Sequence, residues 1–330
     1  MKKLVTLLLS TMFLFSLDTF AFAADGSTVD PEESVGENVY DDNEKKALLE
    51  QRFKVISDYF DTLDSTRAKA FGLQKKISKL EQKLSSMKKE GTKEGVTIKK
   101  LAKEKDIAKK EHQKLLSKIK DLELNSEKLA GLKKLTEVTD SDDISVMYSD
   151  QGDVYVDPDL YYDEDSDHYV MHGQYRWKND AWDADEVGDG PVGGYDGFQL
   201  FVDEDIDRYE YEFRLWTTEG DRADIDPMHD GDPEGDAWLW QDHVFYGWVG
   251  DPYYGENVEQ YDSGYGSGYI YFEFEDPLYA GERVEVGAGY AHTWGVTSIT
   301  GINVGIGGGG VSWTTDEKYW YDEDIDIEEF

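Results

Sequence analysis

The residues best placed to do chemistry are carboxylates in a short acidic loop. Asp230, Asp232, Glu234 and Asp236 stand at the first, third, fifth and seventh positions of a pattern that matches the front of a calcium loop. Alternating carboxylates on a turn can converge on one hard cation, and Ca²⁺ prefers oxygen ligands. The twelfth position, where a bidentate Glu is expected, holds Gln241. We predict that the four acids bind calcium.

Aromatic residues follow this loop directly. Trp238, Trp240 and Trp248 lie beside the acids, where exposed rings would stack on sugars and carboxylates would accept hydrogen bonds from sugar hydroxyls. The alternative is that the rings fill a core, because residues two apart on a strand share one face and a β domain without disulfides needs large side chains for burial. We predict a ligand-binding face at Trp238, Trp240 and Trp248 and keep the core as the alternative.

The other chemical groups favour binding over catalysis. His168 and His172 are four residues apart in a segment with strand character, so they would lie about 13 Å apart, too far to share one ion. The chain has no Cys and no Gly-x-Ser-x-Gly motif. A glycosidase needs two carboxylates around a sugar, and the acidic part offers too many to assign a pair. These features favour a protein without enzymatic activity, although they do not exclude a glycosidase.

Charge divides the chain into two parts. Residues 41–135 contain 25 Lys and Arg against 16 Asp and Glu, whereas residues 136–330 contain 7 against 50. The acidic part also holds all 9 Trp. The acid content of residues 136–330 could reflect only a solvated surface. The opposite net charge of residues 41–135 in the same chain indicates instead that charged residues take part in binding. Such an acidic balance argues against nucleic-acid binding.

The N-terminal residues have the features of an export signal. Lys2 and Lys3 precede an apolar stretch, and Ala21-Phe22-Ala23 ends in small residues suited to cleavage before Ala24. We therefore expect a signal peptide over 1–23, a flexible acidic leader over 24–43, and no membrane-spanning helix after cleavage. The absence of Cys excludes disulfides, and the composition indicates a bacterial source.

Residues 44–135 have a helical pattern. From Leu49 to Met87, positions spaced alternately three and four residues apart are apolar in ten cases out of twelve. The pattern breaks at residues 91–95 and resumes from Ile98 to Leu129. A sustained period of 3.5 is the signature of a coiled coil. We predict a basic, antiparallel helical hairpin, which presents a thin apolar seam and so is expected to self-associate or lean on a partner.

The acidic part has the pattern of an all-β domain. After an expected linker at 136–148, segments such as 209–215 and 283–294 alternate apolar and polar residues, and clusters of Gly, Asp and Pro separate them. We predict an antiparallel, sandwich-like domain over 149–321 and an acidic tail over 322–330. The fold class is therefore α+β with segregated parts, a coiled-coil hairpin followed by a β domain.

Together these features predict a secreted, non-catalytic binding or structural protein of the cell surface or extracellular matrix. Calcium would tune its β domain, and its partners would be an anionic wall polymer or a glycan. The alternative is an envelope-acting hydrolase or a membrane-acting toxin.

Overall fold

The structure is a computed structural model. It describes residues 42–89, 95–135, 154–178, 190–249, 256–279, 281–293, 299–302, 311–313 and 319–329. The expected signal peptide, the linker at 136–148 and nearly all of the acidic leader lie outside these residues. None of the described helices is long and apolar enough to cross a membrane.

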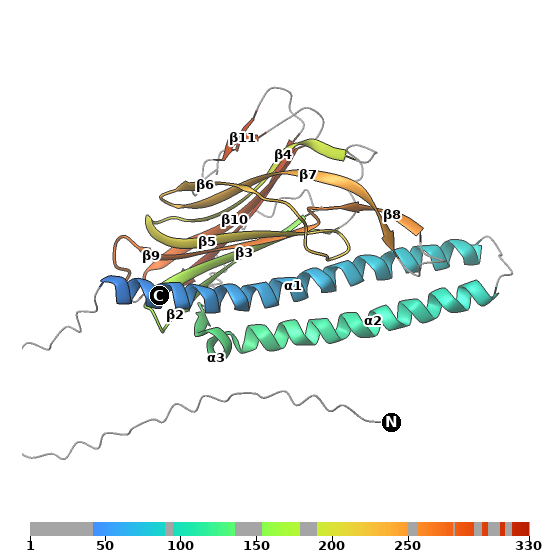
Figure 1. Ribbon diagram of the computed structural model, residues 1–330, viewed down its shortest axis with the longest axis horizontal. Helices are drawn as coiled ribbons and strands as arrows, with labels where there is room; N and C mark the ends of the chain where they lie inside the picture. Colours follow the sequence, from blue (N-terminus) through green and yellow to red (C-terminus); the bar gives the residue numbers. More distant parts are fainter. Residues whose placement is uncertain are drawn as a thin grey trace, which may run out of the picture.

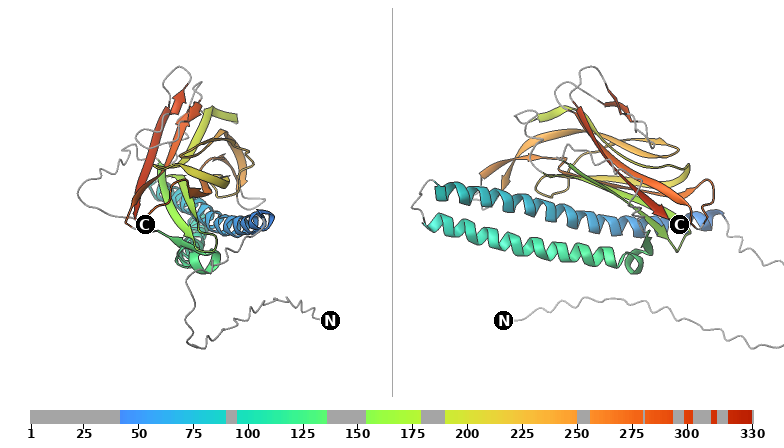
Figure 2. Two further views of the ribbon diagram at one scale, coloured as in Figure 1. Left: turned by 90° about the vertical axis from the view of Figure 1, so that its left-hand side faces the viewer. Right: turned by 180° about the vertical axis from the view of Figure 1, so that it is seen from behind.

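Two long helices open the described chain and lie side by side, running in opposite directions (Figures 1 and 2). They are α1 (Asp42–Lys89) and α2 (Gly95–Leu124), and a short α3 (Ser126–Ala130) follows. Ion pairs such as Lys109 Nζ–Glu81 Oε1 (2.6 Å) join α2 to α1. At the end of α3, Gly131 adopts a left-handed conformation (φ 67°), and its N–H donates to Glu127 O, which stops the helix.

The remainder of the described chain forms antiparallel strands. They are β1 (Leu132–Lys134), β2 (Val154–Asp163), β3 (His168–Trp177), β4 (Gly190–Val202), β5 (Ile206–Trp216), β6 (Met228–Asp232), β7 (Gly235–Val249), β8 (Glu256–Tyr261), β9 (Tyr265–Phe274), β10 (Arg283–Thr293), β11 (Ile299–Ile302), β12 (Val311–Trp313) and β13 (Tyr319–Glu329). Sheet A has the order β1-β2-β3-β9-β5, and sheet B has the order β13-β10-β4-β7-β6 with β8 beside β7. The predicted α+β class, with helices first and antiparallel sheets after, is confirmed.

Two predicted boundaries differ from the structure. The end of the expected helical segment, Leu132–Lys134, is strand β1, which pairs with β2. The expected acidic tail, 322–330, lies almost wholly in β13, which pairs with β10 along its full length. Its acids alternate with Ile325 and Ile327, and that period of two is the pattern of a strand. The high charge of residues 322–330 therefore did not indicate a tail, because these residues form a strand.

Sheet A is buried on both faces. Its inner face packs on sheet B through residues such as Met171, Tyr175 and Ile270. Its outer face packs on α1, so the order of layers is helices, sheet A, sheet B (Figure 1). The residues that α1 and the outer face of sheet A bury together are Ile56, Tyr59, Phe60, Leu63, Tyr161, Val170, Tyr269 and Tyr271. The helical pair is therefore not a free rod, because sheet A covers much of the apolar surface of α1.

Basic residues of the helical part neutralise the acids of β2. Asp163 is fully buried and accepts hydrogen bonds from Arg52 Nη2 (2.5 Å) and Nε (3.1 Å). Asp159, also buried, pairs with Lys134 of β1. These two acids lie on one face of β2. Asp163 meets a cation from α1, and Asp159 meets one from the neighbouring strand β1.

A buried polar network fixes α1 on sheet A. Asp64 of α1 lies 3.1 Å from Nε2 of His172 and accepts a hydrogen bond from Ser267 Oγ (2.7 Å). The ring of Phe60 stacks on His172 with centroids 4.5 Å apart. Burial alone would raise the pKa of Asp64, but attraction to His172 and Arg67, with the hydrogen bonds from His172 and Ser267, lowers it below its ordinary value.

We predict that Asp64→Asn destabilises the protein at neutral pH by about 1–3 kcal/mol, because it weakens a buried, charge-assisted hydrogen-bond network. The folded pKa of Asp64 is lowered. Its stabilisation is therefore complete above the unfolded pKa of about 4 and is lost as the pH falls through the folded pKa. Urea unfolding at a series of pH values should show the wild-type advantage shrinking below about pH 4.

The matched control is Asp61→Asn, one turn earlier on α1, where the carboxylate is exposed and lies 3.7 Å from Arg214 Nε. Its effect should stay within about 0.5 kcal/mol. Equal losses in the two variants would contradict a special role for Asp64.

A close approach at Gly72 generates a second prediction. A Cβ at this buried position would lie 2.0 Å from the backbone oxygen of Glu219, in the turn after β5. Gly72→Val should therefore separate the turn from α1 and lower the free energy of unfolding by about 1–3 kcal/mol, although Val has the better helix propensity. The control is Lys69→Val at an exposed position of the same helix. It should change the free energy of unfolding, measured by urea titration, by less than about 0.5 kcal/mol. A stable Gly72→Val variant would show that the turn does not hold α1.

Candidate ligand-binding pocket

The predicted calcium loop is a β-hairpin turn whose acids point to different faces. Gly231 of β6 lies opposite Asp236 of β7, and Asp230 lies opposite Ala237. Cross-strand partners share a face and successive residues alternate, so Asp230 lies on the face opposite to that of Asp236. The side chain of Asp232 is outside the described set. The prediction of one calcium site from all four acids is wrong, because the strand register puts Asp230 and Asp236 on opposite faces.

Asp236 has a structural partner instead. Its side chain is fully buried and pairs with Arg208 of β5, and its Oδ1 lies 2.7 Å from Nε2 of His229. Burial raises the pKa of Asp236, and the charges of Arg208 and His229 partly offset that rise. Glu234 lies in the turn between β6 and β7, half-buried.

Two residues of the predicted ligand-binding face, Trp238 and Trp240, are part of the protein core. Trp238 and Trp240 are buried between the two sheets, where both rings pack on Phe213 at centroid distances of 5.2 Å and 5.1 Å. Residues two apart on a strand point to the same face of the sheet, and for Trp238 and Trp240 that face is the interior. Trp248 lies in β7 opposite Asn257, and its side chain is outside the described set. Trp238 and Trp240 therefore cannot stack on a sugar from solvent.

The structure places a pocket of about 710 Å³ between the helical pair and sheet A. A volume of this size is typical of sites that enclose a small organic ligand. One wall comes from α1 and α2, and the other from β2, β3 and β9. Its lining residues are Arg67, Ala70, Phe71, Gln74, Lys75, Ser78, His112, Leu116, Ile119, Glu123, Tyr155, Asp157, Gln174, Arg176, Trp177, Lys178 and Tyr265.

The pocket is cationic in a strongly anionic protein. Four of its lining residues are basic (Arg67, Lys75, Arg176 and Lys178), against the acids Glu123 and Asp157, whereas the whole chain has a formal net charge of −38. Lys75 is 8% exposed, and its ammonium nitrogen lies 5.5 Å from the ring centroid of Phe71. Clefts lined by one sign of charge concentrate ligands of the opposite sign.

One wall of the pocket presents hydrogen-bonding groups. Tyr265 donates its hydroxyl proton to Gln174 Oε1 (3.0 Å), and Gln174 Nε2 donates to Asp157 Oδ2 (2.7 Å). Burial and repulsion from Asp159 raise the pKa of Asp157. This chain of alternating donors and acceptors suits a ligand that carries hydroxyl groups.

An aromatic face completes the lining. The guanidinium carbon of Arg176 lies 4.5 Å from the ring centroid of Tyr155, a cation–π contact that supports both side chains. Ser78 Oγ donates to the helix backbone at Gln74 O (3.1 Å), so its hydroxyl is engaged. Among the described lining residues, the arrangement suits recognition of acid groups, hydroxyls and a flat apolar face together.

Sequence reasoning does not find this pocket, because its residues come from both parts of the chain. Arg67 and Lys75 belong to the basic helical segment, whereas Gln174 and Arg176 belong to the acidic one. His112 of α2 also lies in the lining, and partial burial lowers its pKa. The charge reversal between the parts is the one sequence signal that points to their contact.

Comparisons with known proteins identify no relative. No family matches the sequence, and no curated protein matches it. Solved structures with a limited likeness include one described under pH-induced modulation of Streptococcus parasanguinis adhesion by Fap1 fimbriae (10% identity, 52% of this chain and 79% of that chain, TM-score 0.24). Another is AvmM, which catalyses macrocyclization in alchivemycin A biosynthesis (12% identity, 52% of this chain and 88% of that chain, TM-score 0.19). At these TM-scores neither likeness supports a conclusion on fold or function.

Proposed function

We propose that this protein is an exported, non-catalytic binding protein of the cell surface or extracellular matrix. Its ligand is an anionic, hydroxyl-rich polymer or glycan that places an acidic unit in the pocket between the helices and sheet A. The observation that carries this proposal is the cluster of Arg67, Lys75, Arg176 and Lys178 around one cavity of about 710 Å³. In this proposal the coiled-coil hairpin forms one wall of the site and the sandwich-like β domain forms the other.

The lining chemistry defines the ligand class. Arginine binds carboxylates and phosphates through a planar fork of donors, and lysine adds a compact charge. The Tyr265–Gln174–Asp157 chain supplies partners for hydroxyls, and Tyr155 supplies an aromatic face near Arg176. Because basic residues outnumber acids in the lining, an acidic sugar or a phosphate-bearing wall polymer fits the pocket better than a neutral sugar.

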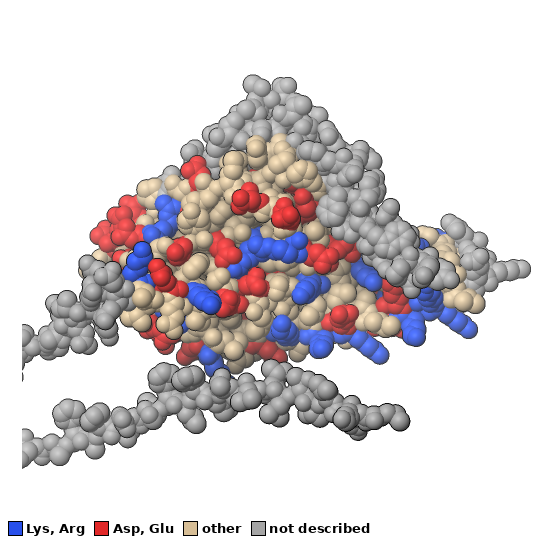
Figure 3. All heavy atoms as spheres, in the orientation of Figure 1, with Lys and Arg blue, Asp and Glu red and all other residues tan. Residues whose placement is uncertain are grey.

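The charge outside the pocket contributes to selectivity. A protein with a net charge of −38 repels polyanions over most of its surface. Lys and Arg side chains gather over α1 and α2 (Figure 3), on the side of the molecule where the pocket lies. An anionic ligand is therefore directed toward the helices, and its binding should weaken as salt screens the interaction.

The proposed function predicts a loss of affinity for acidic polymers when charges at the pocket are removed. Arg176→Gln with Lys178→Gln removes two exposed charges at the pocket and should weaken binding of uronic-acid oligosaccharides or phosphate-linked wall polymers at least tenfold, or about 1.4 kcal/mol. The measurement is isothermal titration calorimetry on the mature chain, at low and at high salt. Neutral oligosaccharides of equal length should bind weakly to both proteins.

The matched control is Lys110→Gln with Lys114→Gln. It makes the same charge change at exposed positions of α2 that do not line the pocket. If both double variants lose affinity equally, the attraction is a general effect of the basic helices and not of the pocket. If no acidic polymer binds the wild type, or if the polymer is cleaved during the titration, the proposed function is wrong.

A further prediction concerns export. Cleavage before Ala24 would remove Lys2, Lys3 and the apolar stretch. Expression in a bacterial host should therefore yield a secreted protein whose first residue, by N-terminal sequencing, is Ala24. Ala23→Lys, which places a large charge at the cleavage position, should leave the precursor uncut. An uncleaved wild-type chain retained in the cytosol would contradict the proposed location.

A further inference from the structure

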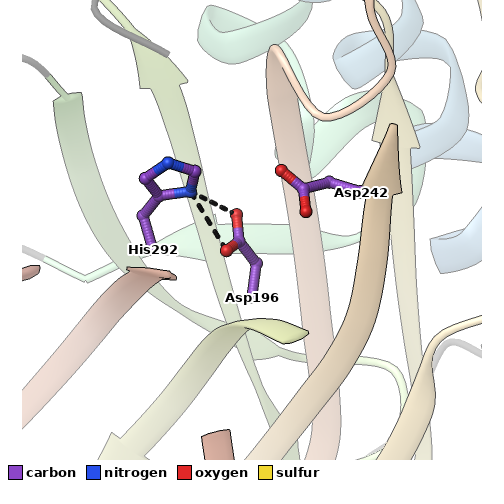
Figure 4. A group of neighbouring side chains, drawn as sticks. All are labelled: Asp196, Asp242 and His292. Atoms are coloured by element: carbon purple, nitrogen blue, oxygen red, sulfur yellow. Dashed lines mark hydrogen bonds and ion pairs between the residues drawn. The ribbon is translucent and has the colours of Figure 1, made fainter. Parts of the chain in front are cut away.

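A second group of ionisable side chains lies between the two sheets. Asp196 of β4, Asp242 of β7 and His292 of β10 offer ligand atoms that all lie within 4.8 Å of one another, and each residue is fully buried. Their strands are neighbours in sheet B, in the order β10-β4-β7. Figure 4 shows the three side chains directed toward one another.

The strand pattern explains why these polar side chains face inward. Asp242 lies two residues after Trp240 in β7, and His292 lies two residues after Tyr290 in β10. Each therefore shares a face with a ring that belongs to the core between the sheets. In β4, Asp196 likewise has the parity of Phe198. Successive residues of a strand alternate between faces, so three polar residues occupy positions where the pattern calls for apolar ones.

Asp196 is held from several sides. It accepts hydrogen bonds from Tyr290 Oη (2.7 Å) and from the backbone N–H of Thr293 (2.9 Å), and its two oxygens lie 2.9 Å and 3.0 Å from Nδ1 of His292. The Tyr261 hydroxyl lies within hydrogen-bond reach of Asp196 and donates to Asp242. Such outer contacts orient ligand side chains in metal centres.

Asp242 supplies the second observation. Its Oδ1 is buried and has no hydrogen-bond partner among the described residues, while Oδ2 accepts from Tyr261. Two carboxylates at this depth are costly unless a positive charge lies between them. The Asp242 carboxylate is directed toward Asp196 and His292 (Figure 4) and keeps one oxygen unpartnered, which is the arrangement that a cation would complete.

We propose that Asp196, Asp242 and His292 bind one divalent cation of the zinc type. Imidazole with carboxylates is a donor set for Zn²⁺, whereas Ca²⁺ takes six to eight oxygen ligands. The described residues of the cluster offer one nitrogen and two carboxylates. Because every member is fully buried, the centre is shielded from solvent.

The proposed ion has a structural role that suits this chain. It joins three strands, β10, β4 and β7, in a protein that has no Cys and so no disulfide. Trp177 of β3, in sheet A, packs edge-on against His292 with centroids 5.0 Å apart. The centre therefore ties sheet B together at a point where sheet A also makes contact.

The experiment measures bound metal directly. The untagged mature chain is stripped with EDTA, dialysed separately against micromolar zinc, manganese or calcium, desalted and analysed by plasma mass spectrometry. We expect about one zinc per chain to be retained, with less manganese and no calcium, and we expect zinc to raise the melting temperature. A wild-type chain that retains no zinc, or that retains calcium in its place, would overturn the proposal.

Variants locate the ion. Asp242→Asn and His292→Gln should abolish zinc retention and the zinc-dependent rise in melting temperature. Asp236→Asn is the matched control, since it removes a fully buried carboxylate from the same face of β7 without touching the cluster. It should retain zinc like the wild type. Equal retention in all four proteins would show that zinc binds elsewhere on the acidic surface and would refute the site.

A variant that keeps all three ligands covers the case in which the others fail to fold. Tyr261→Phe removes only the hydroxyl that contacts both carboxylates. It should weaken zinc affinity by about 10–100-fold, as loss of outer-shell partners does in other metal sites. An unchanged zinc affinity in Tyr261→Phe would contradict the site even if neither ligand variant could be purified.

Discussion

The burial of sheet A on both faces is the constraint on which the rest of the structure depends. An antiparallel sheet with one solvated face needs only one apolar side, but β3 and β9 lie between sheet B and α1 and are buried at nearly every position. The apolar face of α1 is correspondingly wider than the seam toward α2. Polar side chains that fall in this interface, such as Asp64 and His172, must find their partners inside it.

The opposite charges of the two parts meet within one molecule. Arg52 pairs with Asp163, Lys134 with Asp159, and Lys79 with Glu219. Exposed ion pairs contribute little stability, but Asp159 and Asp163 are buried and would oppose folding without their cations. The basic helices therefore act first as the counter-charge of sheet A. The pocket forms where basic side chains of the helices meet Arg176 and Lys178 of the β part, so cations outnumber anions there.

The sequence predicted local structure better than it predicted sites. The spacing from Leu49 to Met87 and the alternation in 209–215 identified helix and strands, because each pattern depends only on near neighbours. The predicted calcium site failed because the register of β6 on β7, a tertiary property, sets which carboxylates share a face. The signal for Asp196, Asp242 and His292 was present, since each breaks an apolar pattern of period two. The pocket had no such signal, because it exists only when α1 docks on sheet A.

Polar contacts between layers explain how so acidic a chain holds one arrangement without disulfides. Ser263 accepts a hydrogen bond from Trp240 Nε1 of sheet B (3.0 Å) and lies 2.5 Å from the Tyr175 hydroxyl of sheet A. Arg208 of sheet A pairs with Asp236 of sheet B. A shift of one residue between the layers would leave these buried polar groups unpaired, which costs more than the same shift between apolar side chains alone. The apolar core therefore supplies the driving force for burial, and the polar cross-links select the register in which the layers pack.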